Sequence, residues 1–350
     1  MEKLLTIVVP AYNAEKYLRD NLESLFMEEI LPYLDILVIN DGSSDHTPDI
    51  AREYVLRCPE SCRMMTKENG GHGSGINLGI QEARGKYFKV VDADDWVEQM
   101  AFCRLVEMLK QQAEAEAAGK GEAADIVSSG FLWAFDRGEP NKNMYETKAE
   151  IAVPFEGVQY GTVYRFDEIA SQLYIKMHNL TIKTEILQKN QIKLDERCYY
   201  VDTEYITYPI PYVKTICFAE GFVYYYRIGS AGQSVGIEKM RKYEGDYNRV
   251  IESLLRFYEK LGREIPCSAE KKGYIAGIIA RAIAGKYKVM LSAPESGEVK
   301  RRMREFDLRL KHQYPEIYRA NINSAVKLLR ATGYGTYKLA SVLVKKKYQK

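Results

Sequence analysis

The first hundred residues alternate short apolar runs with amphipathic segments, and this alternation constrains the fold more than any other feature. Apolar runs at 5–9, 34–40, 62–66 and 87–91 predict strands, and the segments 14–31, 49–56 and 75–83 predict helices between them. Strands separated by helices form βαβ units. We therefore expect an α/β fold with a mostly parallel central sheet flanked by helices.

Polar loops follow each of these four strands. Their sequences are PAYN, NDGSSD, KENGGHGSG and DADD. Because ligands bind at the carboxyl ends of parallel strands, we expect the four loops to form one site at one edge of the sheet. A dehydrogenase would need a glycine fingerprint directly after the first strand, and a nucleotidyltransferase a basic glycine-rich loop there. The PAYN loop disfavours both classes.

Three carboxylates stand together in the DADD loop. Asp92 and Asp94 would project to the same side if the strand geometry continues, and Asp95 to the other side. Carboxylates paired in this way can hold Mg²⁺ or Mn²⁺ against a diphosphate. The alternative is an acidic turn in which Asp94 or Asp95 caps a helix that starts near Trp96.

Composition and length describe an ordinary globular protein. A chain of 350 residues predicts two domains or one large domain with an appendage, and a net charge of +2 gives no sign of a nucleic-acid partner. The sequence begins MEK and then enters a strand-like run, and charges interrupt the apolar stretch 274–290, so we expect neither a signal peptide nor a membrane span. Six scattered cysteines without C-x-x-C spacing predict reduced thiols and a cytoplasmic location, and four scattered histidines disfavour a zinc site.

Later segments have weaker patterns. Residues 125–131 and 215–226 predict strands, 105–122 a long helix, and 166–187 and 201–212 helical pieces. From residue 236 to the end, the pattern is helical throughout.

Four blocks closely resemble the family 2 glycosyltransferases, which have the GT-A fold. They are TIVVPAYNAEKYL at 6–18, ILVINDGSSDHT at 36–47, KENGGHGSGINLGI at 67–80 and GKYFKVVDADDWV at 85–97. YYVDTEYITYPI at 199–210 and VYYYRIGSAGQSV at 223–235 match more weakly. The resemblance implies a GT-A domain at 1–235, with a Rossmann-like nucleotide-sugar-binding half at 1–105 and an acceptor-binding half at 106–235. It does not cover the helical region 236–350.

The first two blocks carry the expected nucleotide contacts. The resemblance places Pro10, Ala11, Tyr12 and Asn13 against the nucleotide. It places Asp41 on the uracil, where a carboxylate can accept a hydrogen bond from the ring N–H. Tyr12 could instead be a core or surface aromatic, and Asp41 could form an Asx turn.

The third block departs from the family pattern. Gly71, His72 and Gly73 stand where many relatives have a bulky or basic residue. His72 could therefore replace an arginine contact to the diphosphate, and the backbone at Gly71 could approach a phosphate closely. Asn77 belongs to the same block, and we expect it to orient the loop.

The fourth block would bind the ribose and the metal. The resemblance puts Asp92 on the ribose, Ala93 beside it and Asp94 on a Mg²⁺ or Mn²⁺ ion that bridges the diphosphate oxygens, with Asp95 as the alternative ligand. Such an ion would neutralise the charge that builds on the leaving UDP.

Inverting transfer also needs a base for the acceptor hydroxyl. In the family this is often the aspartate of a Glu-Asp pair, and here the pair reads Val201-Asp202. Asp202 is the expected base, although it could also cap a helix that starts at Thr203. Glu204 is the alternative base.

Two further residues leave alternatives open. A lone histidine such as His178, in an acceptor-side segment, is more often structural. Arg227 either belongs to a lid over the diphosphate or is a surface residue.

These features predict an inverting glycosyltransferase that moves a sugar from a nucleotide-sugar donor, expected to be a UDP-sugar, to a glycan or lipid-linked acceptor in surface-polysaccharide synthesis. The alternative is a nucleotide-sugar-binding protein with the same fold and no catalysis, which Val201 in place of glutamate favours.

The C-terminal residues combine lysines with apolar residues at helical spacing. Lysines at 338, 345–347 and 350 stand beside Ile322, Val326, Leu329, Tyr337, Leu339, Val342, Leu343 and Val344. This pattern predicts peripheral contact with an anionic membrane on its inner face. The alternative is an apolar face packed on the catalytic domain or on a second subunit of a homodimer.

Overall fold

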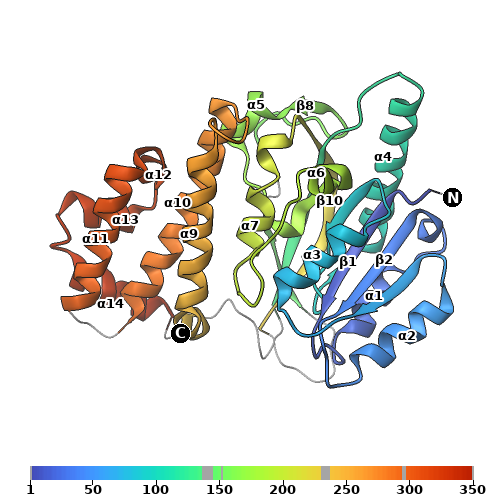
Figure 1. Ribbon diagram of the computed structural model, residues 1–350, viewed down its shortest axis with the longest axis horizontal. Coiled ribbons are helices and arrows are strands. Elements are labelled where there is room, and N and C mark those ends of the chain that lie inside the picture. The colour runs from blue at the N-terminus through green and yellow to red at the C-terminus, as the bar shows by residue number, and fades with distance from the viewer. Residues whose placement is uncertain (1, 136–144, 151–152, 230–236, 294–296, 349–350) are drawn as a thin grey trace. The chain divides into compact units, whose positions relative to one another are not determined.

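The computed structural model describes residues 2–135, 145–150, 153–229, 237–293 and 297–348 (Figure 1). The chain divides into two compact units, residues 1–232 and 233–350. Each unit is described by itself.

One sheet forms the centre of the first unit. Its strands follow the order β3-β2-β1-β4-β9-β6-β10-β5. The strands are β1 (Leu5–Ala11), β2 (Leu34–Asn40), β3 (Cys62–Thr66), β4 (Tyr87–Val90), β5 (Trp96–Val97), β6 (Ile126–Phe135), β9 (Leu180–Lys183) and β10 (Thr215–Ile228), with β7 (Glu146–Glu150) beside β6 and β8 (Val163–Arg165) beside β10.

The predicted α/β fold is confirmed. The four expected strands β1 to β4 form the parallel part of the sheet. β9 then runs antiparallel to both β4 and β6, β10 runs parallel to β6, and β5 is antiparallel to β10. The sheet thus continues from the βαβ half into the rest of the unit.

Successive side chains of β1 point to opposite faces of the sheet, and their contacts show which helices cover each face. Ile7 and Val9 belong to a core shared with α1 (Leu18–Leu25), α2 (Thr47–Arg57) and α4 (Gln99–Ala117). Val8 faces α3 (His72–Glu82), and a Cβ on Gly79 would lie 2.6 Å from the Val8 side chain. The glycine lets α3 pack closely on β1, which brings the first turn of α3 to the end of that strand.

Two predicted helices begin in different places. The helix expected over 14–31 is only α1, because the preceding loop bonds the start of α2 instead: the Ala14 amide donates to Thr47 Oγ1 at 2.7 Å. The helix expected near Trp96 is α4, which begins at Gln99 and is capped by the Glu98 side chain. Neither Asp94 nor Asp95 caps it, so the acidic-turn alternative was wrong in that respect.

The helix predicted over 166–187 was also partly wrong. Residues Leu180–Lys183 form β9 between β4 and β6, with short helices on either side, α5 (Phe166–Ile169) and α6 (Thr184–Lys189). Thr181 and Ile182 are β-branched and buried, which suits a central strand. The next helix is α7 (Asp202–Thr207).

The second unit is helical, as predicted. It consists of α8 (Ile237–Lys242), α9 (Glu244–Lys260), α10 (Ala269–Ser292), α11 (Gly297–Gln313), α12 (Pro315–Ala320), α13 (Ser324–Ala331) and α14 (Tyr337–Tyr348). Helix α10 is central, with Ile275, Ile279 and Tyr287 fully buried, and it packs against α9, α12 and α14.

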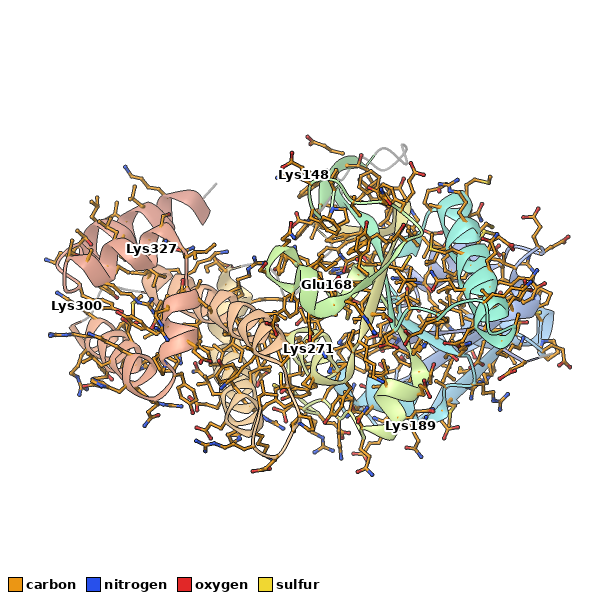
Figure 2. The ribbon with its side chains drawn as sticks, turned by 90° about the horizontal axis from the view of Figure 1, so that it is seen from above. Lys148, Glu168, Lys189, Lys271, Lys300 and Lys327 are labelled. Carbon is orange, nitrogen blue, oxygen red and sulfur yellow. The ribbon has the colours of Figure 1, made fainter. Side chains whose placement is uncertain are left out.

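The buried carboxylate of Asp307 is paired within this unit. Asp307 accepts hydrogen bonds from the Tyr287 hydroxyl at 2.8 Å and from Arg330 Nη2 at 2.7 Å. Exposed lysines such as Lys189 on α6 and Lys327 on α13 project from their own units (Figure 2). Across the residues that the structure describes, no helix combines the length and apolarity needed to cross a membrane.

Candidate functional site

The four polar loops lie at the carboxyl ends of β1, β2, β3 and β4, which are neighbours in the sheet. The first two loops are joined directly. Asn13 has φ +48°, its side-chain oxygen accepts from the Ser44 amide at 2.9 Å, and its own amide donates to Ser43 Oγ at 3.0 Å. Asn13 therefore fixes the loop shape. Tyr12 next to it is 55% exposed, so it is not a core aromatic and its ring is open to a ligand.

Asp41 holds the glycine-rich loop. Its carboxylate is buried and accepts hydrogen bonds from Lys67 Nζ at 2.8 Å and from the amides of Gly70 at 2.9 Å and Gly71 at 2.8 Å. The side chain that bonds the backbone of its own loop is Asn40, which accepts from the Ser43 amide at 3.1 Å. The Asx-turn alternative for Asp41 was therefore wrong, because its oxygens point to a different loop.

The glycine-rich loop is also packed against residues 194–198. Gly71 has φ +81°, and a Cβ on Gly73 would lie 2.2 Å from the Asp195 carbonyl oxygen, so a side chain at Gly73 would not fit. Asn77 accepts from the Leu194 amide at 2.8 Å and donates to the Leu194 carbonyl at 3.0 Å. Asn77 thus orients the segment that leads to α7.

His72 links the glycine-rich loop to the DADD loop. Its Nε2 lies 2.7 Å from Asp92 Oδ1. Burial lowers the pKa of His72, but the charge of Asp92, followed by those of Asp202 and Asp94, outweighs burial and leaves the pKa raised. Burial raises the pKa of Asp92, and His72 more than reverses this, so the pKa is lowered. The two groups favour an imidazolium–carboxylate pair.

The DADD loop is a tight turn with one buried carboxylate. Asp95 is 1% exposed and accepts from the Tyr224 hydroxyl at 2.5 Å and from the Arg227 amide at 2.7 Å. Asn21 Nδ2 donates to the carbonyls of Asp92 at 3.0 Å and Asp95 at 2.9 Å, which holds the turn against α1. Burial, with the nearby charges of Asp94 and Asp92, raises the pKa of Asp95 well above its ordinary value.

His178 lies next to these carboxylates. Its ring packs against Tyr226 at 4.2 Å, Phe131 at 4.9 Å and Tyr224 at 5.0 Å between centroids. Burial lowers the pKa of His178 to about 3, so the ring is neutral at pH 7, and its Nδ1 has no hydrogen-bond partner among the residues that the structure describes. A neutral imidazole keeps a lone pair for a ligand.

One group of side chains in the described residues could hold a metal ion. Asp92, Asp95 and His178 each offer a ligand atom, and these atoms lie within 4.8 Å of one another. Asp94, the residue predicted first as ligand, is not in this group, and its carbonyl accepts from Arg227 Nε at 2.7 Å. Carboxylate oxygens and an imidazole nitrogen together suit Mn²⁺, and carboxylates alone suit Mg²⁺.

Asp202 is the first residue of α7. Although the residue is exposed, the protein around its carboxyl raises the pKa of Asp202, and the charge of His72 and the Thr203 amide offset part of the rise. Glu204 is fully buried. Its two oxygens accept from the Asp195 amide at 2.8 Å and from the Tyr208 hydroxyl at 2.9 Å, so it has a structural role in the folded chain.

Arg227 is not a surface residue. It is 4% exposed, and its guanidinium lies over the rings of Tyr17 at 4.8 Å, Trp96 at 4.8 Å and Tyr145 at 5.1 Å. The surface alternative was wrong, because stacked aromatic rings and the Asp94 carbonyl satisfy a buried guanidinium. A place for Arg227 in a lid over the diphosphate stays a prediction. Residues 230–235 of the same block lie outside the described residues.

Sequence reasoning missed Lys67, Tyr224 and Asn21. A lysine directly after β3, at the edge where the other loops gather, was a usable signal for Lys67. The sequence carries no signal for Tyr224 or Asn21. Each contacts Asp95 of the DADD loop across a long separation along the chain, which is 129 positions for Tyr224 and 74 positions for Asn21.

Part of the chain matches a known family model, and the curated relatives include glycosyltransferases. Residues 6–149 match the model described as glycosyl transferase family 2. The glycosyltransferase GlyG of Streptococcus pneumoniae is 29% identical over 160 residues, 45% of this chain and 49% of GlyG. The minor teichoic acid biosynthesis protein GgaB of Bacillus subtilis is 26% identical over 261 residues, 73% of this chain and 26% of GgaB.

A solved structure extends the likeness to the whole fold. TarS 1–349 of S. aureus, in complex with UDP-GlcNAc, matches with a TM-score of 0.63 at 16% identity, over 99% of this chain and 91% of that chain. In three of the curated relatives the alignment spans 60%, 35% and 49% of the relative's length.

Proposed function

We propose that this chain, whose residues 6–149 match the glycosyl transferase family 2 model, transfers a sugar from a nucleotide-sugar donor to an acceptor hydroxyl. The observation that carries the proposal is the meeting of the four loops at one sheet edge, where His72 and Asp92 join the glycine-rich and DADD loops at 2.7 Å.

A UDP-sugar is the proposed donor. TarS, which shares the fold, is known in complex with UDP-GlcNAc and with UDP. Exposed Tyr12 offers a ring for the base. Asp41 Oδ2 accepts only one hydrogen bond, from the Gly71 amide, among the described residues, so it keeps capacity for the uracil N–H.

Mg²⁺ or Mn²⁺ is the proposed cofactor. Asp92, Asp95 and His178 fit such an ion, because Asp92 is charged, His178 is neutral with an unpaired Nδ1, and a cation would favour the charged form of Asp95. We keep Asp94 as a further ligand within the same turn. When bound, the ion would neutralise charge on the diphosphate leaving group.

The protein's own groups supply the remaining chemistry. The imidazolium of His72 adds positive charge beside Asp92. Asp202 takes the proton of the acceptor hydroxyl, and its raised pKa makes its carboxylate a stronger base. Attack from the face opposite the leaving diphosphate would invert the anomeric carbon.

The acceptor is proposed to be a glycan or lipid-linked glycan of surface-polysaccharide synthesis. GgaB, a relative, is a teichoic acid biosynthesis protein.

The proposed location is the cytoplasm. All six cysteines are free thiols, which supports a cytoplasmic location.

Helix α14 supports peripheral membrane contact. Leu339, Val342 and Leu343 are 56%, 45% and 58% exposed, at helical spacing, and lysines accompany them. Val326 and Tyr337 are instead buried in the second unit, so only part of the apolar stretch is available to a bilayer. A second copy of the chain is the alternative occupant of this face.

The test is UDP release from a panel of UDP-sugars by the full chain, with and without Mn²⁺ and with glycan acceptors. Sugar transfer to any acceptor supports an enzyme. UDP-sugar binding without UDP release or transfer across the panel would favour the non-catalytic alternative that Val201 suggests.

A further inference from the structure

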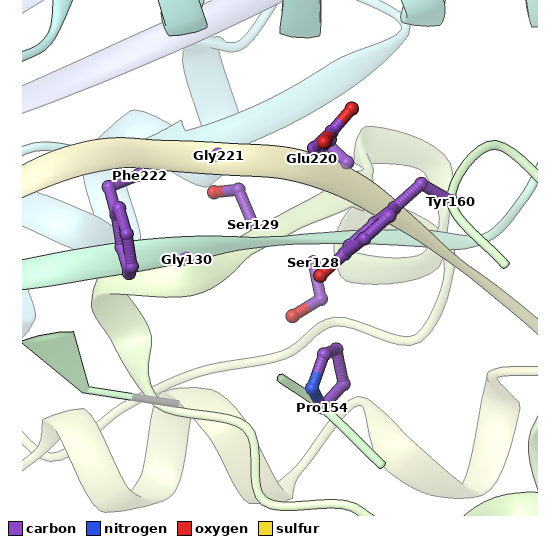
Figure 3. A pocket seen from close by; sticks show the side chains of 9 residues that line it. Ser128, Ser129, Gly130, Pro154, Tyr160, Glu220, Gly221 and Phe222 are labelled. Atoms are coloured by element: carbon purple, nitrogen blue, oxygen red, sulfur yellow. The ribbon is translucent and has the colours of Figure 1, made fainter. Parts of the chain in front are cut away.

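A cavity of about 230 Å³ lies beside β6 and β10, apart from the residues proposed for donor binding (Figure 3). Its lining includes Ser128, Pro154, Tyr160, Glu220 and Phe222. Phe222 is two residues before Tyr224 on β10, and the Tyr224 hydroxyl bonds Asp95. The cavity and the proposed donor site are therefore close to each other along the same strand, β10.

Strand pairing is irregular at the residues that line this cavity. Phe218 pairs with Ser128 and Phe222 pairs with Gly130, so residues 219–221 face the single residue 129. Gly221 has φ +95°, and a Cβ on Gly130 would lie 2.8 Å from the Gly221 carbonyl oxygen. Bulges of this kind occur next to binding sites, where they redirect side chains.

The cavity contains an unpaired buried hydroxyl. Ser129 Oγ lines the cavity, is fully buried and has no hydrogen-bond partner among the described residues, and neighbouring Ser128, which is 6% exposed, forms no side-chain hydrogen bond with them. Figure 3 shows the ring of Tyr160 lying across the cavity, with its hydroxyl end directed toward Ser128. Buried polar groups are normally hydrogen-bonded, so a ligand that supplies a partner here would correct the deficit.

The remaining lining selects the class of ligand. Phe222 and Pro154 give apolar walls, and Glu220 is the only charged residue among those that line the cavity. The carboxylate of Glu220, an exposed residue, disfavours an anionic ligand such as a phosphate. Hydroxyl and carboxylate groups pair well with ligand hydroxyls. The volume is below the roughly 300–1,000 Å³ of pockets for drug-sized ligands, which suits a single ring.

We propose that this cavity binds one neutral sugar residue of the acceptor glycan, away from the hydroxyl that reacts. The proposal rests on the proposed function, because it takes the acceptor to be a glycan. Ser128 and Tyr160 hydrogen-bond the sugar hydroxyls, and Phe222 and Pro154 cover its C–H surfaces.

The test uses the full chain and a panel of methyl glycosides of neutral hexoses, with binding measured by saturation-transfer NMR and titration. Tyr160→Phe removes one hydrogen bond and should weaken binding roughly fivefold. Ser128→Leu fills the cavity and should abolish binding. Tyr33→Phe is the matched control, since Tyr33 lines neither the cavity nor the proposed donor site. UDP affinity, measured in parallel, should stay within about twofold in every variant and show that each is folded.

The expected result is binding of at least one methyl hexoside that UDP does not displace and that Tyr160→Phe weakens. The proposal is overturned if no glycoside binds, if Tyr160→Phe and Ser128→Leu leave binding unchanged, or if UDP displaces the glycoside. Failure of the wild-type chain to bind UDP or any UDP-sugar is a separate result, which would refute the proposed function instead.

Discussion

Replacing Asp41 with asparagine should detach the glycine-rich loop from the end of β2. The carboxylate is 4% exposed and accepts from Lys67 Nζ at 2.8 Å and from the Gly70 and Gly71 amides at 2.9 and 2.8 Å. Asparagine removes the charge and puts a donor where an acceptor is needed. Breaking a buried ion pair costs about 3–5 kcal/mol. Because the Lys67 side chain keeps 25% exposure, we expect the lower end, about 3 kcal/mol.

Unfolding in guanidinium chloride, followed by tryptophan fluorescence, measures this loss of stability in the first compact unit, which contains Asp41. The chain has two tryptophans, Trp96 and Trp133, and both lie within residues 1–232. Asp49→Asn is the control, since Asp49 is 59% exposed in its 2.7 Å pair with Arg52 and should contribute less than about 1 kcal/mol.

A double-mutant cycle with Lys67→Met tests the cause. If Lys67 and Asp41 act as a pair, the double variant should cost less than the two single variants together, by about 1–3 kcal/mol. A cost for Asp41→Asn no larger than that of Asp49→Asn, or additive single costs, would refute the reasoning. UDP affinity should fall along with stability in Asp41→Asn.

Three further predictions concern the base, acid stability and the membrane. Asp202→Asn should keep UDP-sugar binding and lose transfer by roughly 10²–10⁴ in a product assay, and activity above a tenth of wild type would place the base elsewhere. Burial raises the pKa of Asp35, but hydrogen bonds from Arg63 Nε and Nη2, at 2.7 and 2.9 Å, lower it overall. This carboxylate therefore stabilises the fold above its ordinary pKa of 3.8 and stops doing so as the pH falls through the lower folded value. Asp35→Asn should cost about 3 kcal/mol at pH 7 in denaturant titrations, and the difference should shrink below pH 3.8; a pH-independent difference would contradict this. The full chain should float with anionic liposomes and not with neutral ones, and Leu343→Asp should reduce flotation; sedimentation with both lipids would exclude the membrane contact.

The sequence was sufficient for the parallel part of the sheet. Strands β2 and β3 begin and end where their apolar runs do, because turn residues bound both runs. It was not sufficient for β5 and β9. Trp96–Val97 is a strand only because Tyr225 and Tyr224 pair with it from more than a hundred residues away, and β9 is defined by its position between β4 and β6. Such short strands are set by tertiary pairing and carry little local signal.

The same limit applies to the candidate site. Local motifs were enough to select the glycine-rich and DADD loops, since those residues are adjacent in sequence. They could not show that Tyr224 and Arg227 bind Asp95, or that His178 lies next to Asp92 and Asp95. Nor could they show that Asp41 spends most of its hydrogen-bonding capacity on a neighbouring loop, because this depends on how β2 and β3 are aligned.

The central claim is that the loop edge binds a nucleotide diphosphate through a divalent ion, and calorimetry of UDP binding tests it most directly. The titration compares the full chain in Mn²⁺ with the same chain in EDTA, alongside Asp94→Asn, Asp92→Asn and the control Asp49→Asn. The account predicts that UDP binds in Mn²⁺, and that EDTA or either of the first two substitutions weakens binding at least about tenfold, since each removes a charge at the ion. Asp49→Asn should bind as wild type. Equal UDP affinity in Mn²⁺ and EDTA, with Asp92→Asn and Asp94→Asn unchanged, would contradict the account.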